Sequence, residues 1–229
     1  MRWLSMAALA GCSSYPASQD AWDAMESDDR VTVVDRGDFT AFVPVVPETG
    51  GAIAFYPGGK VEPEAYAPVL RRVAESGVAS VLVRMPADLA VLAPKKGDRA
   101  IEAFDEFGPW FAAGHSLGGA MAATWFSKRL DALDGLALLA AYPAKRVDLT
   151  GIDHPVMSVT ASEDGVLNWE TWRERKANLP PSTLYVRIEG GNHAGFAAYG
   201  TQDGDGAATR CPEEQWSITA EALADMVLD

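Results

Sequence analysis

The chain has 229 residues, of which 48% are hydrophobic and 22% are charged, and its 19 Lys and Arg against 32 Asp and Glu give a formal net charge of −13. This apolar content excludes an intrinsically disordered chain, and no run after residue 12 is apolar for long enough to cross a membrane. So negative a chain repels nucleic-acid phosphate, and nucleic acid is therefore not an expected partner. Its two cysteines, Cys12 and Cys211, are too few to frame a disulfide-rich secreted module. These values fit one globular domain.

The first twelve residues, MRWLSMAALAGC, combine one positive charge, a short apolar stretch, small residues and a cysteine. Their last four, LAGC, resemble the lipobox of bacterial lipoproteins. That resemblance implies cleavage before Cys12, a diacylglycerol on the Cys12 thiol, and export of a lipid-anchored protein to the cell envelope. We then expect a signal at 1–11, a polar tether at 12–29 and a folded domain at 30–229. The alternative is an apolar N-terminus of a cytoplasmic protein, because this segment is shorter than most secretory signals.

From residue 31 onward, apolar runs of strand length alternate with stretches of helix length. The turn at 36–38 (RGD) separates runs at 31–34 and 39–43 and predicts a hairpin. Six further apolar runs predict strands covered on both faces: 52–56, 80–83, 110–113, 136–140, 156–159 and 184–188. The predicted helices are 63–76, 97–107, 117–130, 169–178 and 212–228. This alternation predicts an α/β fold with a mostly parallel, doubly wound sheet.

The strand predicted at 110–113 runs directly into the sequence GHSLGG, residues 114–119, which a helix-forming stretch follows. A G-x-S-x-G pattern between a strand and a helix predicts a nucleophile elbow, with Ser116 at its strained apex. Gly114 and Gly118 fit this prediction because a Cβ at either position would clash where the strand turns sharply. The alternative, an ordinary structural turn, does not require the flanking strand and helix.

A serine needs a base to take its proton, and the chain has three histidines. His115 is adjacent to Ser116 and is expected to point away from it. His154 precedes the strand at 156–159 and is expected at the opposite end of the sheet. His193 lies in a glycine-rich loop after the last predicted strand, at the edge where Ser116 also emerges. His193 is therefore the predicted base.

The base in turn needs a carboxylate to orient its imidazole. Asp164 follows the strand at 156–159 and so lies at the same edge, with Glu163 as its nearest competitor. Asp203 and Asp205 follow His193 in the sequence and lie in a loop at 202–206 (QDGDG). We expect this loop to be a solvated turn, with too few ligands for a calcium site. The chain order Ser116, Asp164, His193 is that of an α/β-hydrolase triad.

An oxyanion hole needs a second backbone donor from an earlier loop. Residues 56–61, YPGGKV, follow the strand at 52–56 in the required position. We expect Gly59 or Lys60 to supply one N–H and Leu117 the other. A Pro-Gly-Gly sequence is also an ordinary strand-to-helix turn, and its pairing with the elbow is what favours a functional interpretation.

Several of these segments together resemble a bacterial branch of the α/β-hydrolase family, labelled carboxymethylenebutenolidase-like or dienelactone hydrolase-like. The segments are FYPGGKV at 55–61, MP at 85–86, the elbow, AYP at 141–143, GGNH at 190–193 and DGDG at 203–206. This resemblance implies Ser116, Asp164 and His193 as the catalytic triad. Dienelactone hydrolases use a cysteine nucleophile, so the serine found here means that lactone specificity does not follow from the family label.

The loop between the strands at 136–140 and 156–159 is too short to hold a cap domain. We therefore expect an open pocket for a small or protruding ester rather than the site of an interfacially activated lipase. The predicted function is serine-dependent hydrolysis of a small-molecule carboxylic ester, with no metal and no organic cofactor. Alternatives are a thioesterase, lactonase or peptidase of the same fold, or a catalytically silent binding lipoprotein of the envelope. The sequence leaves the oligomeric state open.

Overall fold

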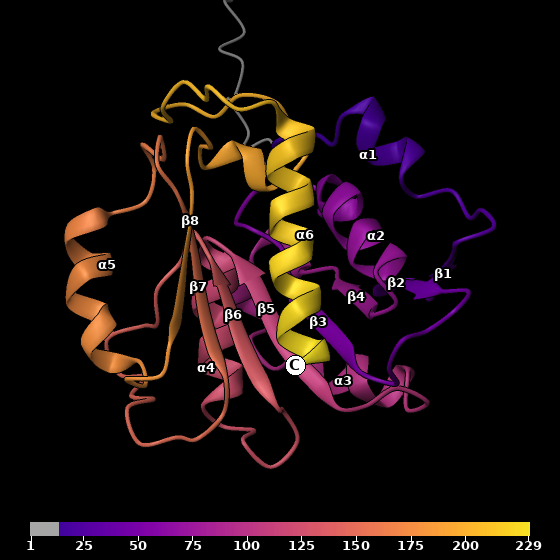
Figure 1. The fold of residues 1–229 in the computed structure, drawn as a ribbon, viewed down its shortest axis with the longest axis horizontal. Coiled ribbons are helices and arrows are strands. Elements are labelled where there is room, and N and C mark those ends of the chain that lie inside the picture. Colours follow the sequence, from indigo (N-terminus) through magenta and orange to yellow (C-terminus); the bar gives the residue numbers. More distant parts are fainter. Residues whose placement is uncertain (1–13) are drawn as a thin grey trace, which may run out of the picture.

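A computed structural model describes residues 14–229, so the signal-like segment and Cys12 lie outside the described residues. An eight-stranded sheet occupies the centre of the molecule, in the order β1-β2-β4-β3-β5-β6-β7-β8 (Figure 1). The strands are β1 (Val31–Asp35), β2 (Phe39–Pro44), β3 (Ala52–Tyr56), β4 (Ala79–Val83), β5 (Trp110–His115), β6 (Gly135–Leu139), β7 (Val156–Ala161) and β8 (Leu184–Ile188). β2 runs antiparallel to β1 and β4, and the other pairs are parallel. The predicted hairpin and mostly parallel α/β fold are confirmed.

Helices cover both faces of this sheet (Figure 1). The α-helices are α1 (Gln19–Asp23), α2 (Ala67–Glu75), α3 (Lys96–Ala103), α4 (Leu117–Phe126), α5 (Trp169–Arg175) and α6 (Pro212–Leu228). The 3₁₀ turns are η1 (Pro63–Tyr66), η2 (Pro86–Asp88), η3 (Ala90–Leu92), η4 (Lys176–Asn178) and η5 (Ala194–Phe196). Side chains of α2 and α6 join one core cluster and those of α3 and α4 join the other.

Alternation along β3 shows how one strand serves both cores. Ile53 and Phe55 belong to the cluster under α2 and α6, whereas Ala52, Ala54 and Tyr56 belong to the cluster under α3 and α4. All five residues are buried. A strand covered on both faces is expected to be apolar throughout, which is why these runs could be recognised in the sequence.

The polar segment that we expected to be a tether lies on the domain instead, at least from residue 14 onward. Tyr15 forms a β-bridge with Val61, and the ring centroids of Tyr15 and Tyr199 are 5.4 Å apart. Ala21, in α1, is fully buried in the core under α2 and α6. A few apolar side chains at irregular spacing suffice for this packing, so no periodic sequence pattern predicted that this segment packs on the domain.

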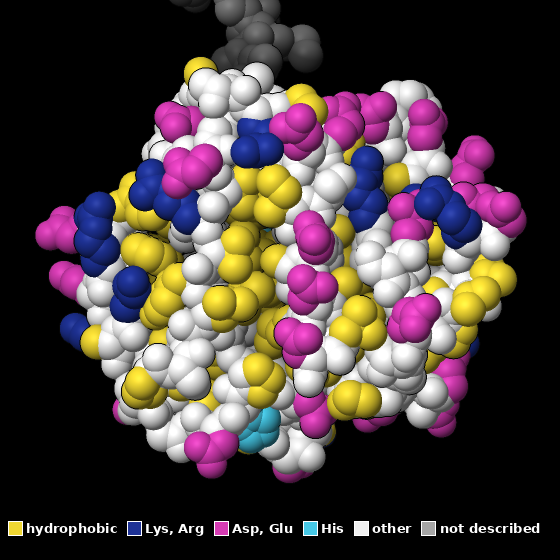
Figure 2. Space-filling view, viewed as in Figure 1, with side chains coloured by type: hydrophobic (Ala, Val, Ile, Leu, Met, Phe, Trp, Pro, Cys, Tyr) yellow, Lys and Arg dark blue, Asp and Glu magenta, His cyan; other side chains and the backbone are white. Residues whose placement is uncertain are grey.

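On the face shown in Figure 2, acidic side chains are widely spread, and some follow the exposed side of α6 in a row. Glu213, Glu214, Glu221 and Asp225 of this helix are exposed. None of the helices within residues 14–229 has the length and apolar character needed to span a membrane.

The strand order reverses between β3 and β5, because the chain leaves β3 for β4 on one side and then returns to β5 on the other. Ligand sites of open α/β sheets form at such a point, beyond the carboxyl ends of the strands. Residues 140–155, between β6 and β7, contain no helix or strand. The expected absence of a cap domain therefore agrees with the structure, and the carboxyl edge of the sheet stays uncovered there.

Candidate active site

Ser116 is the single residue between the end of β5 and the start of α4, and its backbone has φ 53° and ψ −122°. This is the left-handed region, which a residue with a side chain enters only under strain. A Cβ on Gly118 would lie 2.2 Å from the carbonyl oxygens of Tyr56 and Pro57, and one on Gly114 would lie 2.7 Å from the carbonyl carbon of Gly118. The structural expectation for the two glycines is thus confirmed, and the serine hydroxyl sits at the apex of a tight strand-to-helix turn.

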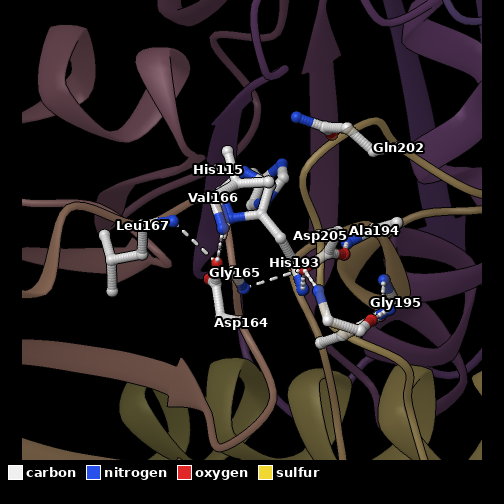
Figure 3. A network of polar contacts seen from close by, with 12 residues as sticks. His115, Asp164, Gly165, Val166, Leu167, His193, Ala194, Gly195, Gln202 and Asp205 are labelled. Atoms are coloured by element: carbon white, nitrogen blue, oxygen red, sulfur yellow. Dashed lines mark hydrogen bonds and ion pairs between the residues drawn. The ribbon is translucent and has the colours of Figure 1, made fainter.

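Asp164 and His193 meet at the same edge of the sheet, from the loops that follow β7 and β8 (Figure 3). His193 Nδ1 and Asp164 Oδ2 are 2.8 Å apart, and both side chains are buried. Asp164 Oδ1 accepts the backbone N–H groups of Val166 at 2.9 Å and Leu167 at 2.7 Å. A carboxylate oxygen is an acceptor, so in this contact Nδ1 is the donor and Asp164 Oδ2 the acceptor.

A cavity of about 350 Å³ connects the serine to the histidine. Its lining consists of Ser116, Leu117, Ala120, Ala140, Ala141, Tyr142, Val166, Leu167, Asn168 and His193. Six of these ten residues are apolar, three of them alanines, and the lining contains no Lys or Arg. The structure thus places Ser116 and His193 on one cavity and Asp164 against Nδ1 of the imidazole.

The other two histidines are engaged elsewhere. His154, just before β7, has Nε2 3.1 Å from the carbonyl oxygen of Leu130, at the end of the sheet opposite the elbow. His115 is buried with Nδ1 2.8 Å from the hydroxyl of Tyr66, and its ring centroid lies 4.4 Å from that of His193. Burial, and secondarily the neighbouring His193, holds the pKa of His115 well below its ordinary value of 6.5. His115 is therefore a neutral buried group, and Tyr66 is a partner that the sequence did not reveal.

The loop after β3 approaches the elbow, but only part of the predicted oxyanion hole is available. Lys60 N–H already donates to the carbonyl oxygen of Asp88 at 2.9 Å, so the prediction that Lys60 supplies an oxyanion donor is wrong. A Cβ on Gly59 would lie 2.8 Å from Leu117 Cδ2, which places Gly59 directly against the first residue of α4. Among the described residues no acceptor takes the N–H of Gly59 or Leu117. Gly58 N–H donates to Tyr66 Oη at 2.9 Å, which holds this loop in place.

The other carboxylates near His193 in the sequence or in space have surroundings that differ from those of Asp164. Glu163 is exposed and accepts a hydrogen bond from the Ser162 hydroxyl. Asp203 is also exposed. Asp205 is not the solvated side chain that we expected, because its carboxylate accepts backbone N–H groups of His193 and Ala194 (Figure 3). The glycines on either side of Asp205 were the available sequence signal, since they permit close approach of another backbone.

Gln215 of α6 is a further residue that the sequence reasoning missed. It is 1% exposed; its Nε2 donates to the carbonyl oxygen of Asn192 at 2.8 Å, and its Oε1 accepts Asn192 N–H at 3.1 Å. A Cβ on Gly195 would lie 2.2 Å from Gln215 Oε1. This buried amide therefore fixes the loop that carries His193 from the α6 side.

Two further features bear on the site: a second buried serine, Ser158, and the placement of metal-ligating side chains. Ser158 is buried within β7, where its hydroxyl accepts a hydrogen bond from Trp172 Nε1 at 3.3 Å, and it does not line the cavity with His193. Within residues 14–229, no three His, Cys, Asp or Glu side chains gather in a way that could hold a metal ion.

The chain belongs to the α/β hydrolase family, whose sequence model matches residues 52–217. No curated protein matches it. Among solved structures, it is similar to a CIB-like hydrolase from Thermoplasma acidophilum (TM-score 0.60, 16% identity, 86% of this chain and 98% of that chain). It is also similar to Est1E from Butyrivibrio proteoclasticus (0.59, 16%, 87% and 100%) and to an esterase domain from Rhodothermus marinus (0.61, 14%, 86% and 97%). At these identities the structural likeness establishes the fold.

Proposed function

We propose that this protein is a serine hydrolase of carboxylic esters, with Ser116 as nucleophile, His193 as base and Asp164 as the acid that orients it. The observation that carries this proposal is the single cavity shared by a strained elbow serine and an imidazole whose Nδ1 is held by a buried carboxylate. The esterase domain from Rhodothermus marinus, which shares the fold, supports the same class of chemistry.

The proposed reaction has two halves. In the first, Ser116 Oγ attacks the carbonyl carbon of the ester and its proton passes to His193 Nε2, while Gly59 and Leu117 N–H groups donate to the oxyanion. The C–O bond then breaks, His193 returns the proton to the departing alcohol, and the acyl group stays on Ser116. In the second, His193 takes a proton from water, the hydroxide adds to the acyl carbon, and Ser116 leaves with that proton.

The cavity favours a short, neutral acyl group. Its volume of about 350 Å³ and its alanine-rich lining leave little room for a long chain. The net charge of −13, with no Lys or Arg in the lining, gives little to attract an anionic substrate. Est1E, which shares the fold, has been solved with bound ferulic acid, so a compact aromatic acid is a second acyl group for testing.

The experiment compares p-nitrophenyl acetate, butyrate and decanoate with dienelactone and methyl ferulate, using the wild type, Ser116→Ala, His193→Ala and the control His154→Ala. We expect hydrolysis of the short esters with the highest kcat/KM, losses of at least about 10³-fold in the first two variants, and wild-type activity in the third. Absence of hydrolysis of every substrate would favour a silent binding protein. Fastest turnover of dienelactone would favour a lactonase.

We also propose, from the sequence alone, that Cys12 carries a lipid anchor and that the protein is exported to the cell envelope. Cys12 lies outside the described residues, and the proposal rests on the LAGC sequence at 9–12. Expression of the wild type and Cys12→Ser in bacteria supplied with a fatty-acid analogue tests it. We expect the variant to leave the membrane fraction and to lose the label; labelling that survives the substitution would contradict the anchor.

A further inference from the structure

The side chain of Asp205 lies between the two loops that carry the acid and the base, and both of its oxygens are used (Figure 3). Asp205 Oδ1 accepts N–H groups of Gly165 at 3.0 Å, His193 at 3.2 Å and Gly206 at 2.9 Å. Its Oδ2 accepts Ala194 N–H at 2.8 Å. One carboxylate thus binds backbone on the loop after β7 and on the loop after β8.

Glycines make this close approach possible. A Cβ on Gly165 would lie 2.5 Å from the carbonyl oxygen of Gly204, and one on Gly206 would lie 2.0 Å from the carbonyl oxygen of Glu163. The two loops therefore meet backbone to backbone, and the Asp205 carboxylate fills the polar space between them. A carboxylate surrounded by N–H groups is a strong, directional acceptor, and its loss would leave several donors unpaired.

The two anchored segments are the ones that must stay in register for catalysis. Gly165 directly follows Asp164, and the His193 N–H belongs to the base itself. The Asp164 to His193 contact depends on two loops that follow different strands. Ser162 Oγ accepts Gly190 N–H and Glu163 N–H donates to the carbonyl oxygen of Gly191 near the strand ends, and Asp205 bonds to the residues next to the acid and base themselves. A displacement of either loop would carry the carboxylate away from the imidazole.

We propose that Asp205 is a positioning residue, which holds the loop of Asp164 and the loop of His193 at the separation that the acid–base contact requires. This proposal rests on the proposed function for its kinetic consequence, but its structural content stands apart from any substrate. Asp205 touches neither the cavity nor a reacting atom, and it acts through the backbone of the two loops.

The first test is kinetic and uses Asp205→Asn, which keeps the shape but replaces one acceptor oxygen by a donor, with Asp203→Asn as the matched control. Asp203 is exposed in the same loop. We expect Asp205→Asn to lower kcat about 10- to 100-fold on p-nitrophenyl acetate with KM within about twofold, because a displacement of ~1 Å in a catalytic group costs that much. We expect Asp203→Asn to match the wild type. Unchanged kcat in Asp205→Asn would overturn the proposal.

The second test needs no substrate. A proton held between His193 Nδ1 and a carboxylate gives a far-downfield proton resonance in the full chain, which Asp164→Asn should abolish and thereby assign. We expect Asp205→Asn to lose or broaden this resonance and Asp203→Asn to keep it; retention in Asp205→Asn would overturn the proposal. Asp205→Ser, which leaves space for water, replaces Asp205→Asn in both tests if circular dichroism shows that Asp205→Asn does not fold. If the wild type hydrolyses no ester but shows the resonance, and Asp205→Asn loses it, the positioning role is supported and the proposed function is refuted.

Discussion

Replacing Tyr66 with Phe removes one hydroxyl from the buried contact between the loop after β3 and the end of β5. This hydroxyl accepts Gly58 N–H at 2.9 Å and lies 2.8 Å from His115 Nδ1. Burial raises the pKa of Tyr66 far above its ordinary value, so the phenol keeps its proton. Since His115 is neutral, the arrangement that uses this proton has Tyr66 donating to Nδ1.

The substitution leaves two buried groups, Gly58 N–H and His115 Nδ1, without their partner. An unpaired buried polar group costs about 1–3 kcal/mol, so with two such groups we expect Tyr66→Phe to lower the free energy of unfolding by roughly 2–6 kcal/mol. It should also loosen the loop that presents Gly59 to the oxyanion. Removing an oxyanion donor costs about 10²–10³ in kcat, and a loosened donor should cost about tenfold.

Tyr56→Phe is the matched control. The Tyr56 hydroxyl also holds two backbone groups, accepting Gly97 N–H at 2.8 Å and donating to the carbonyl oxygen of Pro94 at 3.0 Å, but both lie near the start of α3. Urea unfolding and ester hydrolysis of both variants separate the two effects. We expect a comparable loss of stability in both and a lower kcat only in Tyr66→Phe. Equal kcat in the two variants would refute the role assigned to the Tyr66 hydroxyl.

Three further predictions concern other parts of the site. Asp164→Asn should lower kcat about 10⁴-fold and Glu163→Gln about twofold or less, measured by ester hydrolysis; the reverse order would assign the acid to Glu163. Because the folded-state pKa of His115 is depressed, only the unfolded chain binds a proton at this side chain just below pH 6.5, and the free energy of unfolding falls by about 1.4 kcal/mol for each unit by which the pH is lowered. Urea unfolding of His115→Asn at a series of pH values should show a shallower fall than the wild type. An identical fall would contradict the depressed pKa. Gly118→Ala, whose Cβ would meet two carbonyl oxygens at 2.2 Å, should give an inactive or insoluble protein, and wild-type activity would contradict the elbow geometry.

The central strands could be predicted because burial on both faces makes them apolar throughout, as in β3 and β5. Helix ends were harder to place. The helix predicted at 97–107 ends at Ala103, where Phe104 leaves helical geometry with φ −132° and ψ 55° and its buried ring stacks on Phe107. Tertiary packing of an aromatic side chain decides that boundary, and local propensity carries no record of it.

The pairing of Asp164 with His193 could be predicted because the proposed chemistry restricts the residue types and the sheet restricts their place. Elimination among three histidines led to His193, and strand order led to Asp164. Tyr66 and Asp205 could not be found in this way. Each contacts a segment far away in the sequence, 49 residues from Tyr66 to His115 and 40 from Gly165 to Asp205, and only the folded structure shows that those segments meet.

The most direct test of the proposed function is the site of covalent modification by a fluorophosphonate, a reagent that reacts with activated serines. The wild type, Ser116→Ala and the buried-serine control Ser158→Ala are treated with the reagent, digested and mapped by mass spectrometry. The proposed mechanism predicts a single adduct on Ser116, no fast labelling of Ser116→Ala, and labelling of Ser158→Ala at the wild-type rate. An adduct on another serine, or labelling of Ser116→Ala at the wild-type rate, would contradict it.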